Sequence, residues 1–501
     1  MSTASSRGTT PGPPAETQAG SDDRRGRRAA DLSGTGEHPS PARVAVVLGG
    51  SHTGMLAAAA LADTVDRVVV VERDELPTEA APRKGLPQAR HAHMLWSGGV
   101  RALEELLPGV TEALLAAGAR RAPVTTDMVV LSQHGWFRRW PESHHVILAG
   151  RDLLDATVRA RVLADERIEL LAGTEVLGLV GDAKAVTGVR VRERDGRERT
   201  LGAGTVVDAT GRASGAPRWL AELGLPAPER REVDSGLVYA SRLYLAPEAA
   251  RDSFPVVNVQ PDPRVKGPGR AGFLLPIEHG RWIVTLNGTR GGEPSAADDD
   301  FVRFAREELR HPLIGELLAR AEPLSGVSVT RTTVNRRYFY ERMPAWPENF
   351  TVLGDALAAY NPVYGHGLAV GAQSALLLRD LTRRYGAGSA GLSGRVQKAV
   401  ARPVGAAWDL ATGQDVFYPG ATEGGPTRRD RLVAGYVSRL MRTATGNGRI
   451  ARRVTDVTSL ERRAEVLLTP SVLLAAAVGP LKEPLAEPPL SAEELKRAGL
   501  Q

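Results

Sequence analysis

The residues best placed to do chemistry lie in residues 351–373, where a short apolar run gives way to a glycine-rich loop. Asp355 follows the apolar run, and a loop with Pro362, Gly365 and Gly367 then opens an Ala- and Leu-rich helix. Glycine lets backbone N–H groups approach a ligand closely, and a helix N-terminus favours an anion. The stretch therefore suits a ligand with a polyol, whose hydroxyls Asp355 can bind, and a ring that becomes anionic.

A second group of residues, near the start of the chain, is typical of a dinucleotide-binding βαβ unit. A β-branched run predicts a buried strand, and Gly49, Ser51 and Gly54 follow it at the spacing of the G-x-G-x-x-G fingerprint. The middle position is Ser, which still permits close approach of a pyrophosphate. Glu72 ends the next predicted strand, about 20 residues on, where an acid accepts ribose hydroxyls. We expect these four residues to bind a dinucleotide, the alternative being glycines that only serve packing.

Three more residues are candidates for contacts with the same ligand. Arg73 follows the acid and is either a solvated charge or a stacking partner of the adenine. Arg151 begins a predicted helix that ends near residue 163, and it either reaches the cofactor or is an ordinary first-turn residue. Val176 lies in a predicted strand and is placed to meet the adenine through its backbone.

The elements that carry these residues predict an α/β fold, α+β overall, with a nucleotide-binding domain built from two separate parts of the chain. Between residues 232 and 345 the strands become long and alternating, which indicates an antiparallel sheet with one buried face. Tyr239, Phe273 and Leu275 in this part are candidates for a substrate pocket, or else plain core. The expected division is a disordered tail (1–40), a nucleotide-binding domain in two parts (41–231 and 346–400), an inserted substrate domain (232–345) and a helical region without assigned chemistry (401–501). Elements predicted in these parts include strands over 168–171, 186–192 and 327–340 and helices over 298–321 and 459–468.

Composition excludes several classes of function. The chain has 501 residues and no cysteine, so disulfides, thiolate metal sites and cysteine nucleophiles are excluded. The net charge of +6 comes without a basic stripe interleaved with aromatics, so we expect no nucleic-acid partner. No apolar run approaches the ~20 residues of a membrane span, and no signal peptide is expected, so the expected location is cytoplasmic. The His pairs at 91, 93 and 144, 145 could be read as metal ligands, but no carboxylate clusters with them and the chain has no thiol, so we expect no metal.

Taken together, the motifs resemble the flavoprotein monooxygenases with the glutathione-reductase-type FAD-binding Rossmann domain. The resemblance covers roughly residues 43–400 and rests on the fingerprint ending at Glu72, the Asp-Ala-Thr-Gly-Arg-Ala-Ser segment (208–214), and the Gly354-Asp355 motif with its loop. The middle segment has Thr210-Gly211 where the phenol-hydroxylase version has Asp-Gly. The resemblance implies FAD as cofactor, O2 as co-substrate and electrons from NAD(P)H, either directly or through a flavin reductase as partner.

A closer resemblance lies in residues 83–99 and 103–109, which read RKGLPQARHAHMLWSGG and LEELLPG. These segments resemble the actinobacterial flavin-dependent epoxidases of polyether ionophore antibiotic biosynthesis, of the monensin and lasalocid type. The resemblance implies a monooxygenase of secondary metabolism that epoxidises alkenes of a linear hydrophobic polyketide, a polyene either free or carrier-bound, through a flavin C4a-hydroperoxide. Such a reaction needs no catalytic base. His366 is then a candidate proton donor, the alternative being that only its backbone is used.

Other readings stay open at this point. The same fold serves prenyl- or geranylgeranyl-type double-bond reductases and related hydroxylases. A flavin halogenase is less favoured, because its Trp-x-Trp-x-Ile-Pro signature is absent and residues 136–141 do not supply it. A serine hydrolase is excluded because Ser51 lacks the glycine that a nucleophile elbow needs two residues on. A flavin-binding protein without turnover is the non-enzyme alternative.

Overall fold

A computed structural model describes residues 43–83 and 85–501, so the tail expected over 1–40 lies outside the described residues. The fold is mixed α/β, as predicted. Its centre is a five-stranded parallel sheet whose Val-rich strands are almost wholly buried, as parallel strands covered on both faces must be. The order is β21 (Phe350–Val352), β12 (Thr205–Asp208), β1 (Val44–Leu48), β2 (Arg67–Val71) and β8 (Ile168–Leu171).

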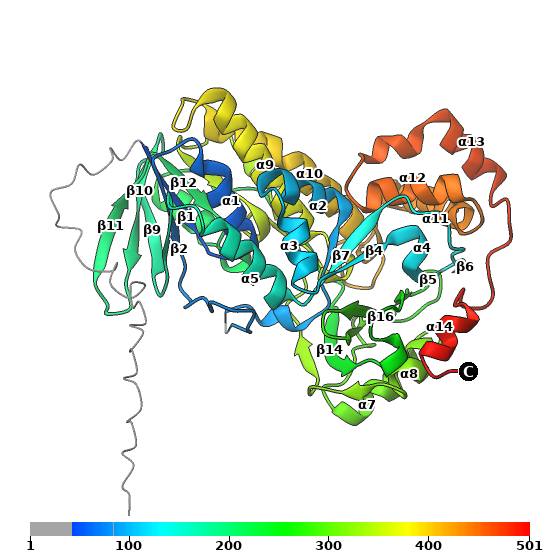
Figure 1. The fold of residues 1–501 in the computed structure, drawn as a ribbon. Coiled ribbons are helices and arrows are strands. Elements are labelled where there is room, and N and C mark those ends of the chain that lie inside the picture. Colours follow the sequence, from blue (N-terminus) through cyan, green and yellow to red (C-terminus); the bar gives the residue numbers. More distant parts are fainter. Residues whose placement is uncertain (1–42, 84) are drawn as a thin grey trace, which may run out of the picture. The chain divides into compact units, whose positions relative to one another are not determined.

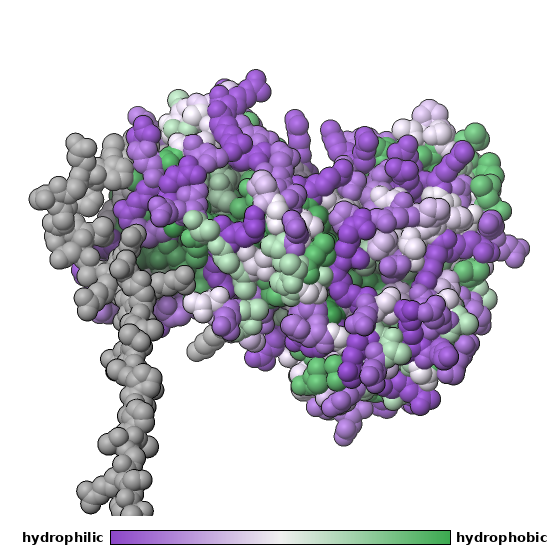
Figure 2. Space-filling view, viewed as in Figure 1, coloured by the Kyte–Doolittle hydropathy of each residue, from purple (hydrophilic) through white to green (hydrophobic). Residues whose placement is uncertain are grey.

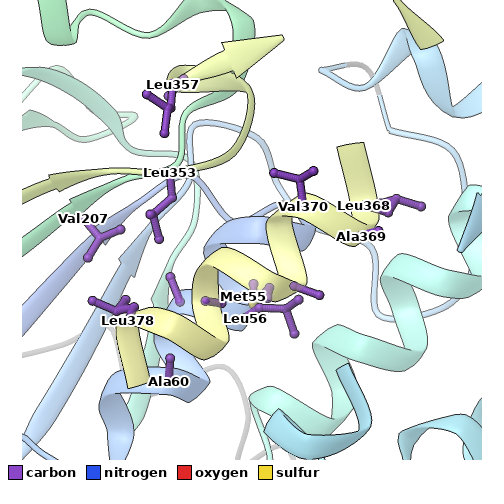
Figure 3. Close-up of a cluster of buried hydrophobic side chains, with 14 of the residues drawn as sticks. Met55, Leu56, Ala60, Val207, Leu353, Leu357, Leu368, Ala369, Val370 and Leu378 are labelled. Atoms are coloured by element: carbon purple, nitrogen blue, oxygen red, sulfur yellow. The ribbon is translucent and has the colours of Figure 1, made fainter. Parts of the chain in front are cut away.

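Two helices pack against each other and against this sheet. They are α1 (His52–Ala62) and α9 (Gly367–Tyr385), which come from the two parts of the predicted nucleotide-binding domain. Figure 3 shows Met55 and Leu56 of α1 facing Val370 and Leu378 of α9, next to Val207 of β12. The many alanines of α1 allow the close approach. This shared core fixes the glycine turn before α1 relative to the loop before α9.

Further helices flank this unit (Figure 1). The helix predicted from Arg151 is present, and the predicted strands over 168–171 and 186–192 have the predicted bounds. The flanking helices are α2 (Ser97–Leu106), α3 (Val110–Ala116), α5 (Arg151–Val162), α6 (Ala216–Glu222) and α10 (Leu392–Asp415). The one-turn helix α4 (Val124–Asp127) lies apart from this unit (Figure 1). Two small antiparallel sheets add β11 (Glu198–Gly202), β10 (Val186–Arg192) and β9 (Glu175–Gly181), and β3 (Met94–Trp96), β7 (His145–Leu148) and β4 (Arg120–Pro123).

The predicted antiparallel sheet is present and has eight strands. It takes β5 and β6 from an earlier part of the chain, and β5 pairs with β15 in parallel. The sheet therefore draws on residues before 232, and the proposed boundary at 231/232 falls within another strand, β13 (Arg230–Val233). Its strands are β18 (Glu322–Pro323), β14 (Val238–Leu245), β17 (Arg281–Gly288), β16 (Arg270–Ile277), β15 (Val256–Val259), β5 (Met128–Ser132), β6 (Gly135–Trp136) and β19 (Ser328–Thr330).

Two elements predicted as continuous are broken. The strand predicted over 327–340 is β19 followed by β20 (Asn335–Tyr338), which leaves this sheet and pairs with β13 and β22 (Ala358–Ala359). The helix predicted over 298–321 is α7 (Asp298–Arg303), a π-helical turn and α8 (Leu313–Leu318). Pro312 explains this break, because it disfavours the helical conformation in the residue before it.

The C-terminal region is helical, as predicted, but one predicted helix is wrong. Helix α12 ends at Thr458, and the helix predicted over 459–468 does not form. Leu460 has a positive φ of 57°, which is incompatible with a helix there. Only a short 3-10 turn, Ala464–Leu468, remains there. The helices are α11 (Arg428–Gly446), α12 (Gly448–Thr458), α13 (Pro470–Val478) and α14 (Ala492–Arg497). Among the described helices none is long and apolar enough to cross a membrane.

Candidate cofactor and substrate cavity

A cavity of about 820 Å3 runs along the carboxyl ends of the parallel strands. It is the place where the two parts of the predicted nucleotide-binding domain meet. Ten of the eleven predicted cofactor residues line it: Gly49, Ser51, Glu72, Arg73, Arg151, Val176, Asp355, Pro362, Gly365 and Gly367. Gly54 is the exception, and it lies behind the glycine turn.

The glycine turn between β1 and α1 is closely packed. Gly49 has a φ of +97°, and a methyl group added there would lie 2.6 Å from the Ala209 carbonyl oxygen. A methyl group added at Gly54 would lie 1.8 Å from the Gly49 carbonyl oxygen. Gly54 therefore lets α1 begin directly against the turn, the part that the third glycine of the fingerprint has in dinucleotide-binding folds.

The acid at the end of β2 is buried and held in place. Glu72 accepts hydrogen bonds from the backbone N–H groups of Gly50, at 2.7 Å, and Asp74, at 3.0 Å. Arg83 lies 3.5 Å from the same carboxylate. Arg73 borders the cavity but leaves 65% of its side chain exposed, 3.9 Å from Asp74, which agrees with the solvated alternative. Val176 forms part of the wall from β9.

A buried positive charge lies beneath the glycine turn. Arg151, the first residue of α5, donates a hydrogen bond to Asp155 at 2.8 Å and lies 3.4 Å from the Ser51 hydroxyl. Burial alone would raise the pKa of Asp155, but the charge of Arg151 holds it below its usual value. The guanidinium is thus oriented toward the N-terminus of α1. A phosphate placed there would meet both the Arg151 charge and the helix dipole.

His52 offers a test of whether the cavity fits a polar ligand. It borders the cavity, it is buried, and neither of its ring nitrogens has a hydrogen-bond partner among the described residues. Burial, with the nearby Arg151 charge, lowers its pKa to about 4, so the ring is neutral at pH 7. A buried polar group without a partner is costly. The arrangement therefore fits a ligand with hydrogen-bonding groups in the glycine turn, as a dinucleotide has.

Asp355 and Arg212 face each other at the middle of the cavity. The Asp355 side chain is enclosed by protein except toward the cavity, where 41% of it is exposed. Burial raises its pKa, and Arg212, whose Nε lies 4.0 Å away, opposes that rise. Arg212 donates hydrogen bonds to the carbonyls of Val334, at 2.9 Å, and Tyr360, at 2.5 Å. Arg212 therefore joins the segment after residue 330 to the loop after Asp355. The sequence did not indicate this role for Arg212.

The loop that opens α9 rests on a buried polar network. Asn361 accepts hydrogen bonds from the Val363 N–H, at 3.1 Å, and from the Tyr239 hydroxyl, at 2.7 Å. Its amide donates to Asp415 of α10 at 2.9 Å. Asp415 thus fixes which side of the Asn361 amide faces the loop. Asn361 and Asp415 were not singled out from the sequence, because the residues of this network are remote in the chain.

The three predicted pocket residues do not line the cavity themselves. Tyr239 lies behind two residues that do line the cavity: it donates a hydrogen bond to Asn361, and its ring centroid is 5.9 Å from that of His91. Phe273 and Leu275, on β16, are buried in the large core cluster. The residues between 232 and 345 that do border the cavity are Thr330, Thr332 and Tyr338. A role for the three in substrate binding stays a prediction.

His366 lies in the cavity wall with a defined tautomer. Its Nε2 is 2.8 Å from the Thr458 carbonyl oxygen, which can only accept, so Nε2 carries the proton. Burial lowers its pKa to about 4, and Nδ1 has no hydrogen-bond partner within the described part of the chain. A neutral ring of this tautomer presents an acceptor, whereas the sequence suggested a proton donor. The donor role stays a prediction that this tautomer does not favour.

The C-terminal region contributes to the same wall. Three successive carbonyls at the C-terminal end of α12 accept hydrogen bonds from other elements. The Thr458 carbonyl accepts from His366, the Ser459 carbonyl from the Gly98 N–H at 3.1 Å, and the Leu460 carbonyl from Gln373 at 2.9 Å. These contacts join α12 to the N-terminal parts of α2 and α9. The region to which the sequence assigned no chemistry therefore positions the end of the cavity near His366.

The segment over residues 83–99 also borders the cavity. His91 lies 2.8 Å from the Ser241 hydroxyl, and His93 donates from Nδ1 to the His91 carbonyl at 2.8 Å. Burial lowers the pKa of His91 to about 4 and that of His93 to about 3. Trp96 donates to the Tyr364 carbonyl at 3.1 Å. This segment thus faces the loop that opens α9.

One group of potential metal ligands occurs among the described residues. His144 lies 3.0 Å from Asp456 and 3.6 Å from Glu461, carboxylates that the sequence did not place near it. Arg453 pairs with Asp456 at 3.0 Å, and Arg101 pairs with Glu461. The arginines already compensate both carboxylates, so we assign no metal to this cluster.

Comparison with known proteins agrees with this geometry. Residues 45–235 match the family model described as FAD dependent oxidoreductase. The match covers the glycine turn, Glu72 and Arg151. Across the chain, a protein of Mycobacterium tuberculosis (strain ATCC 25618 / H37Rv), Protein Rv3254, is 29% identical over 413 residues, which cover 77% of this chain and 83% of that protein.

Solved flavoprotein structures share the fold. The flavin-dependent brominase Bmp2 superposes with a TM-score of 0.61 and 14% identity, over 83% of this chain and 92% of the brominase. The p-nitrophenol 4-monooxygenase PnpA from Pseudomonas putida DLL-E4 superposes with a TM-score of 0.57 and 16% identity, over 84% of this chain and 98% of that enzyme. At these identities the likeness concerns the fold, and it agrees with the predicted FAD-binding architecture.

Proposed function

We propose that this flavoprotein is a FAD-dependent monooxygenase that epoxidises alkenes of a linear hydrophobic polyketide polyene. The observation that carries the proposal is the position of residues 83–99. This segment, which resembles the polyether-type epoxidases, borders the cavity and contacts the loop that opens α9 through Trp96 and Tyr364. The segment that carries the resemblance to the epoxidases, of which related hydroxylases and prenyl reductases have similar versions, thus lies where the reacting part of the cofactor would be.

The chain's own residues fit FAD in the cavity. Arg151 and the α1 N-terminus would hold the pyrophosphate, Glu72 the adenosine ribose, and Asp355 the ribityl hydroxyls. The amides of Gly365 and Gly367 would face the flavin's pyrimidine side and stabilise negative charge on the reduced ring. When bound and reduced, FAD would supply activation of O2 to an electrophilic oxygen donor, with electrons from NAD(P)H or from a flavin reductase.

The titratable groups at this end favour an alkene over a phenol as the substrate. His91, His93 and His366 have pKa values of about 4, about 3 and about 4, because they are buried. Such weak bases are poorly matched to deprotonating a phenol at pH 7. Epoxidation of an alkene requires no deprotonation of the substrate. The protein then has to position the alkene and keep water out.

Replacing Asp355 is expected to weaken FAD binding strongly. Asp355→Ala removes a charge-assisted hydrogen bond worth about 1.5–3 kcal/mol, so the Kd for FAD should rise about tenfold to a hundredfold. The measurement is a fluorescence titration of the apoprotein with FAD. Asp299→Ala, at an exposed carboxylate on α7, is the matched control and should bind as the unsubstituted chain does. An unchanged Kd in Asp355→Ala would remove Asp355 from the site.

The proposed reaction is tested by mixing the chemically reduced holoenzyme with O2 in a stopped-flow spectrometer, with and without a linear polyene. We expect a transient near-ultraviolet absorbance before oxidised flavin returns, shortened by the polyene, and an epoxide in the product. Direct return to oxidised flavin in both mixtures would contradict the proposal. A saturated product formed without O2 consumption would instead establish a double-bond reductase of the prenyl type.

A further inference from the structure

The positive charge of the chain is concentrated in its C-terminal helices. Residues 427–482, named here the basic helical segment, contain eleven Lys and Arg and only four Asp and Glu. The segment therefore carries a formal charge of +7, whereas the whole chain carries +6. The rest of the chain is close to neutral, so the asymmetry belongs to this one segment and not to the protein's general composition.

The same segment exposes most of the large apolar side chains that face solvent. Single exposed apolar residues are ordinary, but eight of the twelve in the described part of the chain lie here. Figure 2 shows apolar surface over α13, at the upper right. The eight are Leu432, Val433, Val437, Leu468, Leu473, Leu474, Val478 and Leu481, with exposures between 39% and 77%.

Helix α13 shows the feature most clearly. Its sequence is PSVLLAAAV, apolar around the whole helix, yet only Val472 and Ala476 are buried. These two residues pack with Leu440 and Ala444 of α11 in a small separate core. The side of α13 that carries Leu474, 67% exposed, and Val478, 69% exposed, therefore faces away from this small core and is mostly open to solvent.

Basic and apolar residues share the same stripes of α11. Arg428 lies one turn before Leu432, and Arg429 lies one turn before Val433, which in turn precedes Val437. Residues four apart are neighbours on a helix surface. A surface that contacts this face of α11 must therefore take up apolar side chains and positive charge together.

We propose that the basic helical segment docks the protein on an anionic lipid bilayer, with the exposed leucines of α13 between the headgroups and the arginines on lipid phosphates. Interfacial helices combine an apolar face with Lys and Arg in this way. Helix α13 is about 14 Å long by its nine residues, too short to span, so it lies in the interface. This goes beyond the proposed function and does not depend on it.

Two other occupants fit the segment less well. A second copy of the chain would bring two patches of the same charge together, which costs free energy. A nucleic acid would meet arginines but also the leucines, and no exposed aromatic side chain in the segment is placed to stack on a base. Anionic lipid is the partner that satisfies both the charge and the apolar surface.

The test is co-sedimentation of the full-length, FAD-loaded protein with vesicles. One set is pure phosphatidylcholine and the other is an equimolar mixture with phosphatidylglycerol. We expect binding to the anionic vesicles, reversed by salt, and little binding to the neutral ones. The double variant Leu473→Ser, Leu474→Ser and the triple variant Arg428→Gln, Arg429→Gln, Arg431→Gln should each bind at least about tenfold less.

The controls distinguish binding by the basic helical segment from nonspecific binding by any exposed apolar residue. Val265→Ser with Leu324→Ser changes two exposed apolar residues outside the segment, 67% and 47% exposed, and should bind as the unsubstituted protein does. The FAD content of every variant reports that it is folded. No binding to anionic vesicles at low salt would overturn the proposal, as would equal binding by the α13 variant. Concentration-dependent dimers that the α13 variant abolishes, without vesicle binding, would replace lipid with a second copy.

Discussion

Gly54→Ala is expected to weaken FAD binding about tenfold to a hundredfold. The added methyl carbon would lie 1.8 Å from the Gly49 carbonyl oxygen, a backbone atom that cannot rotate away as a side chain can. The glycine turn would have to move, and overpacking of this kind costs about 1–3 kcal/mol, or about a tenfold to hundredfold loss of affinity where the turn itself binds the ligand. The flavin absorbance of the purified protein and its Kd for FAD measure the effect.

The matched control is Gly413→Ala, in the last turn of α10. No atom lies within 4 Å of a methyl group added there, and alanine favours a helix by about 1 kcal/mol over glycine. FAD binding should be unchanged in this variant. A folded, fully loaded Gly54→Ala protein would contradict the assignment of the turn to the cofactor.

A second variant separates loss of binding from loss of folding. Ser51 is the N-cap residue of α1, a position where aspartate is favoured, so Ser51→Asp should fold normally. Its carboxylate would lie at the turn, next to Arg151, and would repel the FAD pyrophosphate. We expect a stable protein with little FAD. Full FAD occupancy in this variant would place the pyrophosphate elsewhere.

The cofactor end of the cavity could be predicted from the sequence because its residues follow local rules. A glycine turn after a β-branched strand, an acid at the end of the next strand and a glycine loop before a helix each indicate a backbone geometry. The parallel sheet then brings their ends to one edge. Ten of the eleven residues chosen in this way border one cavity.

The rest of the cavity could not be predicted, because it depends on contacts between residues remote in the chain. Asp415 reaches Asn361 only because α10 returns to the loop, and Thr458 meets His366 only because the C-terminal end of α12 reaches the start of α9. No local pattern marks either contact. Phe273 and Leu275 illustrate the converse, since alternation in a strand places a side chain on the buried face without saying whether a cavity or a core lies there.

Acid is expected to destabilise the fold between pH 6.5 and 4. His52, His91 and His366 have pKa values of about 4, and His93 of about 3, all lowered from 6.5 chiefly by burial. In this window the unfolded chain binds protons that the folded chain does not, so the free energy of unfolding falls as the pH falls. Below the pKa values of the folded state, these histidines no longer lower the free energy of unfolding. One such ring contributes about 3 kcal/mol, and the four together are comparable to the stability of a whole domain.

Buried carboxylates act with the opposite sign. Burial raises the pKa of Asp208, Asp355 and Asp415, so these groups bind protons more readily in the folded chain and favour it as the pH falls. A single histidine variant isolates the imidazole contribution from theirs. His366→Gln removes one titrating ring, while its amide can still donate to the Thr458 carbonyl.

The measurement is urea unfolding of the unsubstituted protein and of His366→Gln at several pH values from 7 to 4. The unsubstituted protein should lose about 3 kcal/mol more stability over this range than His366→Gln does. His279→Asn is the control, because His279 is exposed and has a positive φ of 62°, which asparagine tolerates. Its pH dependence should match that of the unsubstituted chain. If His366→Gln also matched it, the neutral, buried state of this ring in the cavity wall would be wrong, and with it the acceptor role that the Thr458 hydrogen bond implies.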